Sequence, residues 1–473
     1  MVVCAATAML MLDIAVVNTA LSRIAEDLNT GLSGLQWVVD AYTLALASVV
    51  LTAGALADRL GRRRLFTIGL GIFTVASAAC ALAQDIVFLN TSRAVQGVGA
   101  AIMFAVSLAL LANAYPNAKE RAGALAAYGA TIGGAFALGP LVGGLLTSGI
   151  DWQWIFLINI PFGIACIYVT RAYVVESRDP NAHGVDWAGQ LTLTAGLFLL
   201  VLALLRGNED GWTSTLIVAE LAGSAAALAA FVVAELRSAQ PMLPLRYFRD
   251  GSFTGAQIAA FAISATFFAM FLYTTLYLQQ ILGLSAIEAG LVYLPGTLLL
   301  LVVSGATATV GAKLPARTMI SVGLGMVAVG MALFTLAGVS SSWTIMLPGL
   351  LFACVGTGLF NPALTNVALS SVPHEQSGVA AGVNDTFRQA GIAVGVAALG
   401  ALIPAEAAFG GGTPQEYVAG FHTALLVGGA VAAAGALAAW LLISPSYGAA
   451  AEAPVEATET ERPAALRPAY EAA

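Results

Sequence analysis

Five charged residues stand inside long apolar runs of the chain: Asp13, Asp40, Arg93, Asp385 and Arg388. Placing such a charge at the centre of a bilayer costs about 2.5–3.5 kcal/mol on insertion scales, so each one needs a partner or a function. A carboxylate that is dry in one conformation and wet in another changes its affinity for protons between the two. These residues therefore predict proton coupling or substrate transport, with structural ion pairing as the alternative.

The spacing of these groups leaves several roles open. Asp385 and Arg388 are three residues apart and share one helix face, which suits an internal ion pair as well as coupling. Asp40 lies near the predicted outer mouth, where either a cation-attracting gate or a solvated carboxylate is expected. Among the other acids in apolar runs, Glu220 is more consistent with a structural role, and Glu288 with a helix cap.

The chain lacks the residues that several catalytic chemistries require. The nucleotide-binding motif G-x-x-x-x-G-K-[ST] is absent, because neither Lys119 nor Lys313 precedes a serine or threonine. His183, His374 and His422 have no metal-ligand spacing, and the four cysteines form no C-x-x-C pair. We therefore predict a protein that is not an enzyme and uses no metal or cofactor, its energy source being a proton gradient.

Composition determines the class of protein in which these groups act. Of the 473 residues, 59% are hydrophobic and only 10% are charged, too few charges to cover a water-soluble surface. The chain is thus a polytopic membrane protein, and soluble, disordered and disulfide-rich secreted folds are excluded. The net charge of -7 owes much to a polar tail with five glutamates, so no basic surface for nucleic acid is present.

Fourteen apolar runs are long enough to cross a bilayer as helices. With a cytoplasmic N-terminus, fifteen arginines and lysines fall on the cytoplasmic side and two on the outer side, so both termini are predicted to be cytoplasmic in the plasma membrane. All seven tryptophans fall at predicted span ends. Ser33-x-x-Gln36 and Ser285-x-x-Glu288 predict capping boxes. The predicted spans are residues 3–22, 37–57, 65–84, 88–112, 122–147, 153–172, 187–205, 214–234, 253–280, 287–311, 318–337, 343–369, 378–403 and 419–443.

Two parts of the chain resemble each other. Gly54 matches Gly305 at an offset of 251, and the Gly-x-Gly of residues 97–99 matches that of residues 356–358 at an offset of 259. Two parallel halves suit alternating access around a site at the midplane. The predicted domains are an N-terminal six-helix bundle (1–185), two additional helices (186–240), a C-terminal six-helix bundle (241–445) and a disordered cytoplasmic tail (446–473).

The loop after the second predicted span, residues 54–64, reads GALADRLGRRR. Arginines after a span are by themselves only a sign of the cytoplasmic side. The added pattern of Gly54, Asp58, Arg59, Gly61 and Arg62 indicates a conformational latch, because glycine permits a tight turn and aspartate can pair with an arginine or a helix N-terminus. This loop resembles the hallmark motif of the major facilitator superfamily, which implies an all-α fold of two pseudo-symmetric six-helix bundles.

Five further segments resemble the fourteen-span drug:proton antiporter family within that superfamily. They are residues 12–21 (LDIAVVNTAL), 93–101 (RAVQGVGAA), 139–144 (GPLVGG), 152–161 (WQWIFLINIP) and 380–391 (AAGVNDTFRQAG). In the third segment, Gly139, Pro140, Gly143 and Gly144 match a helix motif associated with antiport, although Ala135 stands where that motif has glycine. Glycine allows close helix contact and proline lets the helix bend, and simple packing is the alternative role.

The resemblance implies a proton-coupled secondary active exporter of drug-like, hydrophobic or amphipathic small molecules. The expected partners are a small-molecule substrate, protons and the lipid bilayer, with no nucleic acid and a monomeric chain. The first alternative is the same fold carrying a specific metabolite or a self-made antibiotic. The second is a non-transporting receptor or a membrane-embedded enzyme, against which the intact Asp58 loop and the few clustered polar groups argue.

Overall fold

The computed structural model describes residues 1–115, 117–178, 184–310, 314–372, 377–404, 406–407 and 412–445. Within these residues all regular structure is helical. Thirteen helical segments are long and apolar enough to span a membrane. The fourteenth, α14 (Ser377–Gly400), contains two amides and two charged residues, Asn384, Asp385, Arg388 and Gln389, which lower its hydropathy. The predicted all-α polytopic fold is confirmed, whereas the tail expected over 446–473 lies outside the described residues.

The first six spans are built from seven helices, because the sixth span is divided. They are α1 (Val2–Asp27), α2 (Leu32–Leu60), α3 (Arg62–Ala81), α4 (Ile86–Ala114), α5 (Ala118–Gly149), and α6 (Trp154–Leu157) followed by α7 (Asn159–Tyr173). We call the end of the bundle where α1 ends and α2 begins the distal end. The opposite end, which carries the N-terminus, is the proximal end.

The remaining spans comprise an additional pair and a second set of six. The pair is α8 (Trp187–Asp210) and α9 (Thr215–Arg237). The second set is α10 (Gly251–Leu276), extended by the π-turn η2 (Tyr277–Ile281), then α11 (Ala286–Val310), α12 (Ala316–Phe334), α13 (Leu347–Ser370), α14 and α16 (Pro414–Leu442). Short 3-10 turns, η1 (Leu245–Arg249) and η4 (Trp343–Met346), precede α10 and α13.

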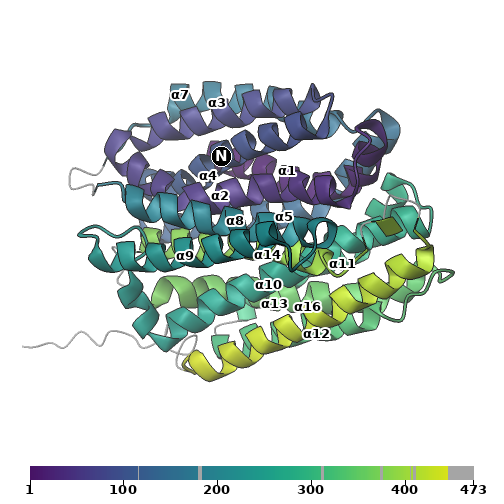
Figure 1. Cartoon of the computed structure of the whole chain (residues 1–473). Helices are drawn as coiled ribbons and strands as arrows, with labels where there is room; N and C mark the ends of the chain where they lie inside the picture. The colour runs from purple at the N-terminus through teal and green to yellow at the C-terminus, as the bar shows by residue number, and fades with distance from the viewer. Residues whose placement is uncertain are drawn as a thin grey trace, which may run out of the picture.

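The two sets of six helices pack by the same pattern. In the first set, α1 packs against α5 and α7, α4 against α2 and α3, and α3 against α7. In the second, α10 packs against α14 and α16, α13 against α11 and α12, and α12 against α16. The sets meet along two seams, α2 with α14 and α5 with α11. Helix α8 touches both α2 and α14, so the additional pair lies over the first seam (Figure 1).

Glycines at matching positions let corresponding helices approach closely. A Cβ atom at Gly139 of α5 would overlap Ala15 of α1. A Cβ atom at Gly391 of α14, 252 residues later, would lie 2.6 Å from the carbonyl oxygen of Phe261 in α10. The offset of the internal repeat therefore has a structural counterpart in these two helix pairs.

The Gly-x-Gly match does not have such a counterpart. A Cβ atom at Gly97 would meet Tyr42 of α2, whereas one at Gly356 would meet Gly323 of α12. Because α12 corresponds to α3 and not to α2, these glycines face different neighbours in the two halves. Residues two apart on a helix point to nearly opposite sides, so a short glycine pattern alone does not define the register of the repeat.

Two sequence expectations about helix ends have different outcomes. The capping box at Ser285 and Glu288 is confirmed: the Ser285 backbone N–H donates to Glu288 at 2.8 Å, and the Glu288 N–H donates to the Ser285 hydroxyl at 3.3 Å. The box expected at Ser33 and Gln36 is wrong, because α2 already begins at Leu32. The Gln36 side chain is therefore free for another partner.

One tryptophan at a span end is buried inside the protein. Trp152 is completely buried, and its indole N–H donates to Asp27 at 2.8 Å. It packs edge-on against Phe156 and closes the distal end of the first bundle. By contrast, Trp154, Trp187 and Trp212 are exposed, as expected for indoles at the headgroup level.

The α5–α11 seam leads to a first prediction. A Cβ atom at Gly144 would lie 2.5 Å from the Ala286 carbonyl oxygen and 2.8 Å from the Ile287 Cα atom. Overpacking costs about 1–3 kcal/mol, which exceeds the roughly 1 kcal/mol that alanine gains over glycine in a helix. We expect Gly144→Ala to lower the melting temperature in detergent. Gly129→Ala, on the same helix but with nothing within 4 Å, should not lower it. Equal decreases would contradict the tight seam.

Candidate functional site

The most buried ion pair of the molecule joins α1 to α4. The Arg93 Nη1 atom donates to the Asp13 Oδ2 atom at 2.5 Å, and the two residues are 2% and 1% exposed. A charge without a partner at this depth would be costly, so each group requires the other. The sequence singled out both residues separately, and the structure brings them together.

Neutral side chains complete the hydrogen bonds of this pair. The Asp13 Oδ1 atom accepts from the amides of Gln96 at 2.9 Å and Asn159 at 2.8 Å. Gln96 also donates to the hydroxyl of Ser77 at 2.8 Å. The network links α1, α3, α4 and α7, and Asp13 accepts three hydrogen bonds in it. Gln96 and Asn159 lie inside the family-like segments, but no sequence signal pointed to Ser77.

Helix α2 joins the network through its backbone and one ring. The Arg93 Nε atom donates to the carbonyl oxygen of Val38 at 3.0 Å. The guanidinium carbon lies 4.3 Å from the centre of the Tyr42 ring, within the range of a cation–π contact. Arg93 therefore holds α2 as well as α1, and the first bundle is fastened around one cation.

Asp40 of α2 is buried without such partners. Its exposure is 0%, and neither carboxylate oxygen has a hydrogen-bond partner among the described residues. It lies one helical turn from Gln36, which contacts the second half of the molecule. The alternative of a solvated Asp40 is wrong, because the side chain is enclosed at the α2–α14 seam.

Asp385 and Arg388 lie on α14 and are both half-buried. The Arg388 Nη1 atom donates to the Asn361 side-chain oxygen at 3.2 Å. In the described part of the chain, Arg388 and Asp385 form no ion pair within 4.0 Å, so the internal pair that their spacing suggested is wrong for this conformation. A shared helix face brought them near each other, but Asn361 of α13 competes for the guanidinium.

The loop between α2 and α3 contains the predicted latch residues. Asp58 and Arg62 form a local ion pair at 2.8 Å, four residues apart. Gly61 has φ of 109°, a backbone conformation that favours glycine, and it allows the chain to turn into α3. A Cβ atom at Gly54 would meet no atom within 4 Å, and the Arg59 side chain is exposed.

An acid outside the motif anchors this loop. The Glu176 carboxylate accepts from the backbone N–H groups of Arg63 at 3.0 Å and Arg64 at 3.1 Å, and so caps the N-terminus of α3. The Arg62 N–H donates to the carbonyl oxygen of Ser177 at 3.0 Å. Sequence analysis missed Glu176, because a residue more than a hundred positions away carries no local signal.

Glu220 has a structural partner, as its sequence context suggested. It accepts from the Arg206 Nη1 atom at 3.0 Å, and Arg206 also pairs with Asp210 at 2.7 Å. These contacts join α8 to α9 at the distal end. Among the described residues, no group of three or more acidic, histidine or cysteine side chains is arranged to hold a metal ion.

Hydrogen bonds between the two halves are found at the distal end. The Gln36 amide donates to the Tyr273 hydroxyl at 2.7 Å, and the Gln279 amide donates to the Thr19 carbonyl oxygen at 3.0 Å. On the other seam, the Ile287 N–H donates to the Ser148 hydroxyl at 3.2 Å. Farther toward the proximal end, Cβ atoms at Gly54, Gly129, Gly305 and Gly378 would meet nothing within 4 Å, although one at Gly382 of α14 would lie 2.9 Å from Leu51 of α2. The distal side is therefore the closed side.

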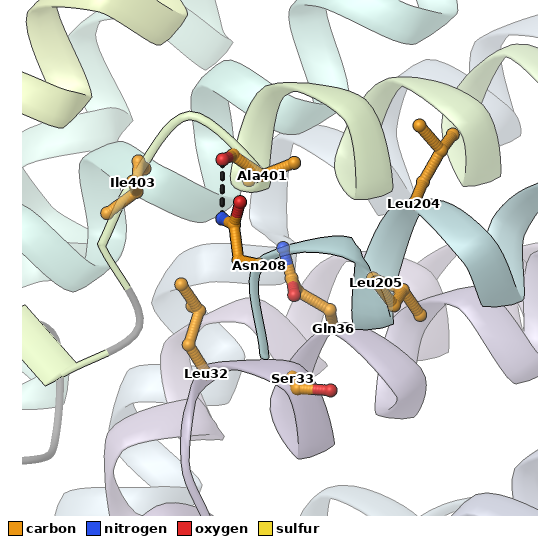
Figure 2. A pocket seen from close by; sticks show the side chains of 9 residues that line it. Leu32, Ser33, Gln36, Leu204, Leu205, Asn208, Ala401 and Ile403 are labelled. Carbon is orange, nitrogen blue, oxygen red and sulfur yellow. Dashed lines mark hydrogen bonds between the residues drawn. The ribbon is translucent and has the colours of Figure 1, made fainter. Parts of the chain in front are cut away.

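Helix α8 adds a contact to this closed side. The Asn208 amide of α8 donates to the Ala401 carbonyl oxygen, just beyond α14, at 2.5 Å. Beside it lies a small pocket formed by the ends of α2, α8 and α14, into which Gln36 projects (Figure 2). At its other end α8 is tied to α2 by a short hydrogen bond between Gln190 and Thr52.

Comparison with known sequences gives consistent relatives. The profile of the Major Facilitator Superfamily matches residues 3–396. The multidrug resistance protein Stp of Mycobacterium tuberculosis (strain CDC 1551 / Oshkosh) is 37% identical over 400 residues, which cover 84% of this chain and 74% of that protein. The methylenomycin A resistance protein of Streptomyces coelicolor is 32% identical over 434 residues, 92% of this chain and 89% of that protein. The probable actinorhodin transporter of the same organism is 34% identical over 414 residues, 85% of this chain and 71% of that protein.

Comparison with solved structures shows the same fold at low sequence identity. A peptide transporter POT in complex with sulfate has a TM-score of 0.66 at 16% identity, covering 93% of this chain and 95% of that chain. The human organic anion transporter MFSD10 (TETRAN) has a TM-score of 0.60 at 16% identity, covering 93% and 98%.

The buried pair leads to a second prediction. Arg93→Met leaves Asp13 buried without its cation, which costs about 3–5 kcal/mol, so the variant should melt far below the parent protein. Adding Asp13→Asn removes the unpaired charge and should restore part of the loss. Melting temperatures of the two single variants and the double variant in detergent give the coupling between the residues. Strictly additive losses would contradict the paired network.

Proposed function

The chain belongs to the Major Facilitator Superfamily, and from that premise we propose that it is a proton-coupled secondary active exporter of hydrophobic or amphipathic drug-like molecules. The names of its relatives support the substrate class, since they include multidrug and antibiotic resistance proteins. The family is one of transporters, so the alternative of a membrane-embedded enzyme is wrong.

The observation that carries the proton coupling is the contrast between Asp40 and Asp13. Asp13 has a cation and two amide donors, and these contacts make it part of the framework of the first bundle. Asp40 is fully buried and has no donor or cation among the described residues. An isolated carboxylate in such a place takes up a proton rather than remain charged. We therefore assign the transported proton to Asp40, with Asp385, half-buried on α14, as a second titrating group.

The proposed cycle is alternating access between residues 1–185 and 241–445. With Asp40 protonated, the distal end is closed by the contacts of Gln36, Gln279 and Ser148. Loss of the proton on the proximal side and binding of substrate favour opening of the distal side, where a new proton displaces the substrate. We place the proximal end, with both termini, in the cytoplasm, because fifteen of the basic residues map to that side.

The motif of α5 has a place in this cycle. Gly139 and Gly143 contact α1 inside the first half, whereas Gly144 and the Pro140 carbonyl oxygen contact α11 of the second half. One helix thus packs closely on both sides of the moving boundary. We propose that this motif allows the two halves to close tightly at the distal end.

A narrower substrate range is the second candidate. Two relatives carry the names of single antibiotics, methylenomycin A and actinorhodin, which supports export of one self-made or environmental compound. A toxicity panel in an efflux-deficient host separates the two: resistance to many unrelated compounds favours the multidrug exporter, and resistance to one favours the specific exporter. Absence of efflux of any compound would favour a receptor.

A third prediction tests the coupling. Dye efflux from cells that express the protein should stop when a protonophore collapses the proton gradient. Asp40→Asn should reduce proton-coupled efflux to the level of cells without the protein, because the amide cannot carry a proton. Glu26→Gln, which alters an exposed carboxylate of α1, is the matched control and should pump normally. Efflux that ignores the protonophore would overturn the antiport proposal.

Stability provides an independent test of which carboxylate is neutral. Asp40→Asn replaces a protonated acid by an amide of the same shape, so the melting temperature should change little. Asp13→Asn removes the partner of a buried arginine and should lower it strongly, by the equivalent of about 3–5 kcal/mol. If Asp40→Asn proves as destabilising as Asp13→Asn, the assignment of the proton to Asp40 is wrong.

A further inference from the structure

We propose that the side-chain amide of Gln36 is the switch that connects the proton on Asp40 to closure of the distal end. The proposal rests on the proton-coupled function above and adds the residue through which protonation moves the halves. Gln36 is a positioning residue in this mechanism: it carries no proton itself, and it acts by choosing between two partners.

In the closed conformation the Gln36 amide is occupied by the second half. Its Nε2 atom donates to the Tyr273 hydroxyl of α10 at 2.7 Å and lies 3.5 Å from the Val396 carbonyl oxygen of α14. The Tyr273 hydroxyl in turn donates to the same Val396 oxygen. A primary amide has two N–H groups, and both acceptors within reach of this nitrogen belong to the second half.

The surrounding packing holds the amide in this position. Gln36 is 4% exposed, and a Cβ atom at Gly400 of α14 would overlap both the Gln36 amide and the Tyr273 hydroxyl. The Tyr417 hydroxyl donates to the Tyr273 carbonyl oxygen at 2.9 Å and fixes that part of α10. Figure 2 shows Gln36 projecting from α2 toward the contact of Asn208 with Ala401. Position 400 must therefore be glycine for the Gln36 amide to reach Tyr273, because any side chain there would occupy the same space.

The competing partner lies on the same helix. Asp40 follows Gln36 by four residues, so the two side chains are neighbours on one face of α2, a spacing at which glutamine and aspartate form hydrogen bonds. In the closed conformation both Asp40 oxygens lack a partner in the described part of the chain. The donor that would satisfy an ionised Asp40 is thus the one that bridges the seam.

The other charged groups near Asp40 are already engaged or lie elsewhere. Tyr273 of α10 is a titratable group close enough to be affected by a charge on Asp40. Within the spans that pack against α2, Asp13 of α1 pairs with Arg93 of α4, and Arg206 of α8 pairs with Glu220 and Asp210. Asp385 and Arg388 of α14 lie farther toward the proximal end. The charged groups at the helix ends include Arg23, Glu26 and Asp27 of α1, which pair with one another, and Arg62, Arg63 and Arg64 at the start of α3. Because the engaged groups are not available to neutralise Asp40, we assign this role to the Gln36 amide, one helical turn away on the same helix.

The step follows from this competition. When Asp40 loses its proton to the proximal side, the new carboxylate accepts an N–H from Gln36, which leaves Tyr273 and Val396. The seam loses its hydrogen bonds and the distal end opens. When a proton from the distal side neutralises Asp40, the amide is released and bridges to the second half again. Acid therefore favours the closed form, and loss of the proton favours the open form.

A cross-linking experiment measures closure at the other seam. In a chain whose four native cysteines are replaced, Ser148→Cys and Ile287→Cys place thiols on the two residues that are joined by the hydrogen bond from the Ile287 backbone N–H to Ser148. The disulfide-linked fraction, quantified by mass spectrometry after brief oxidation across a pH series in detergent, reports the closed population. The parent protein should cross-link well at acidic pH and less as the pH rises. Asp40→Asn should cross-link equally at every pH.

Two variants distinguish the switch from a simple contact. Gln36→Met removes the donor from both partners. Its disulfide-linked fraction should therefore be lower than that of the parent at acidic pH, and it should change less as the pH rises. Tyr273→Phe removes a hydrogen-bond partner that exists in the closed form only. Its disulfide-linked fraction should still fall by the full amount as the pH rises, but the midpoint of the fall should lie at a lower pH than in the parent. For one hydrogen bond, each change in the closed-to-open ratio should be about two- to tenfold. Tyr277→Phe, whose hydroxyl donates to the Gly338 carbonyl oxygen within the second half, is the matched control.

The outcomes separate this proposal from the function on which it rests. If efflux depends on the proton gradient but Gln36→Met keeps the parent pH response, the switch is wrong while the exporter stands. If cross-linking follows pH as expected but efflux ignores a protonophore, the switch stands and the coupled function is wrong. An unchanged response in Tyr273→Phe would show that the seam does not depend on this hydrogen bond.

Discussion

The structure depends on one constraint: inside a membrane protein, no water satisfies a charge or a donor that lacks a partner. The first bundle meets it around Arg93, whose guanidinium binds Asp13 of α1, the Val38 carbonyl oxygen of α2 and Gln96 of its own helix. Asn159 of α7 completes the shell of Asp13. A charge that would be costly without partners thus holds several helices together through its hydrogen bonds.

Close packing of helix backbones accounts for the way the two halves meet. Small residues allow α5 to touch α1 on one side and α11 on the other, and α14 repeats the contact with α10. The α5–α11 contacts are tight at Gly144 and Gly290, where a Cβ atom would overlap the backbone of the opposite helix. The additional helices α8 and α9 cover only the α2–α14 seam, which makes the two otherwise similar seams different.

Two buried aspartates show how neighbours decide chemistry. Both occur in apolar helices, and the sequence offers no reason to assign them different roles. Asp13 is surrounded by donors within the first bundle, whereas both oxygens of Asp40 lack a partner among the described residues, and the Gln36 amide one turn away donates to the second half. A mobile proton requires a site whose partners change with conformation, and the seam meets that requirement because its two sides belong to different halves.

Hydrophobicity and charge, read along the chain, were sufficient to predict the helical membrane fold and its long apolar helices, because a bilayer of fixed thickness requires them. The superfamily was indicated by the resemblance of the loop at residues 54–64 to a known motif. Hydrophobicity and charge also singled out Asp13, Arg93 and Asp40, since charges are rare in such runs. Only the tertiary structure decided which of these groups pair. The distances along the chain are the physical reason: Gln36 meets Tyr273 across 237 residues, and no local pattern encodes which face of one helix will meet which face of another.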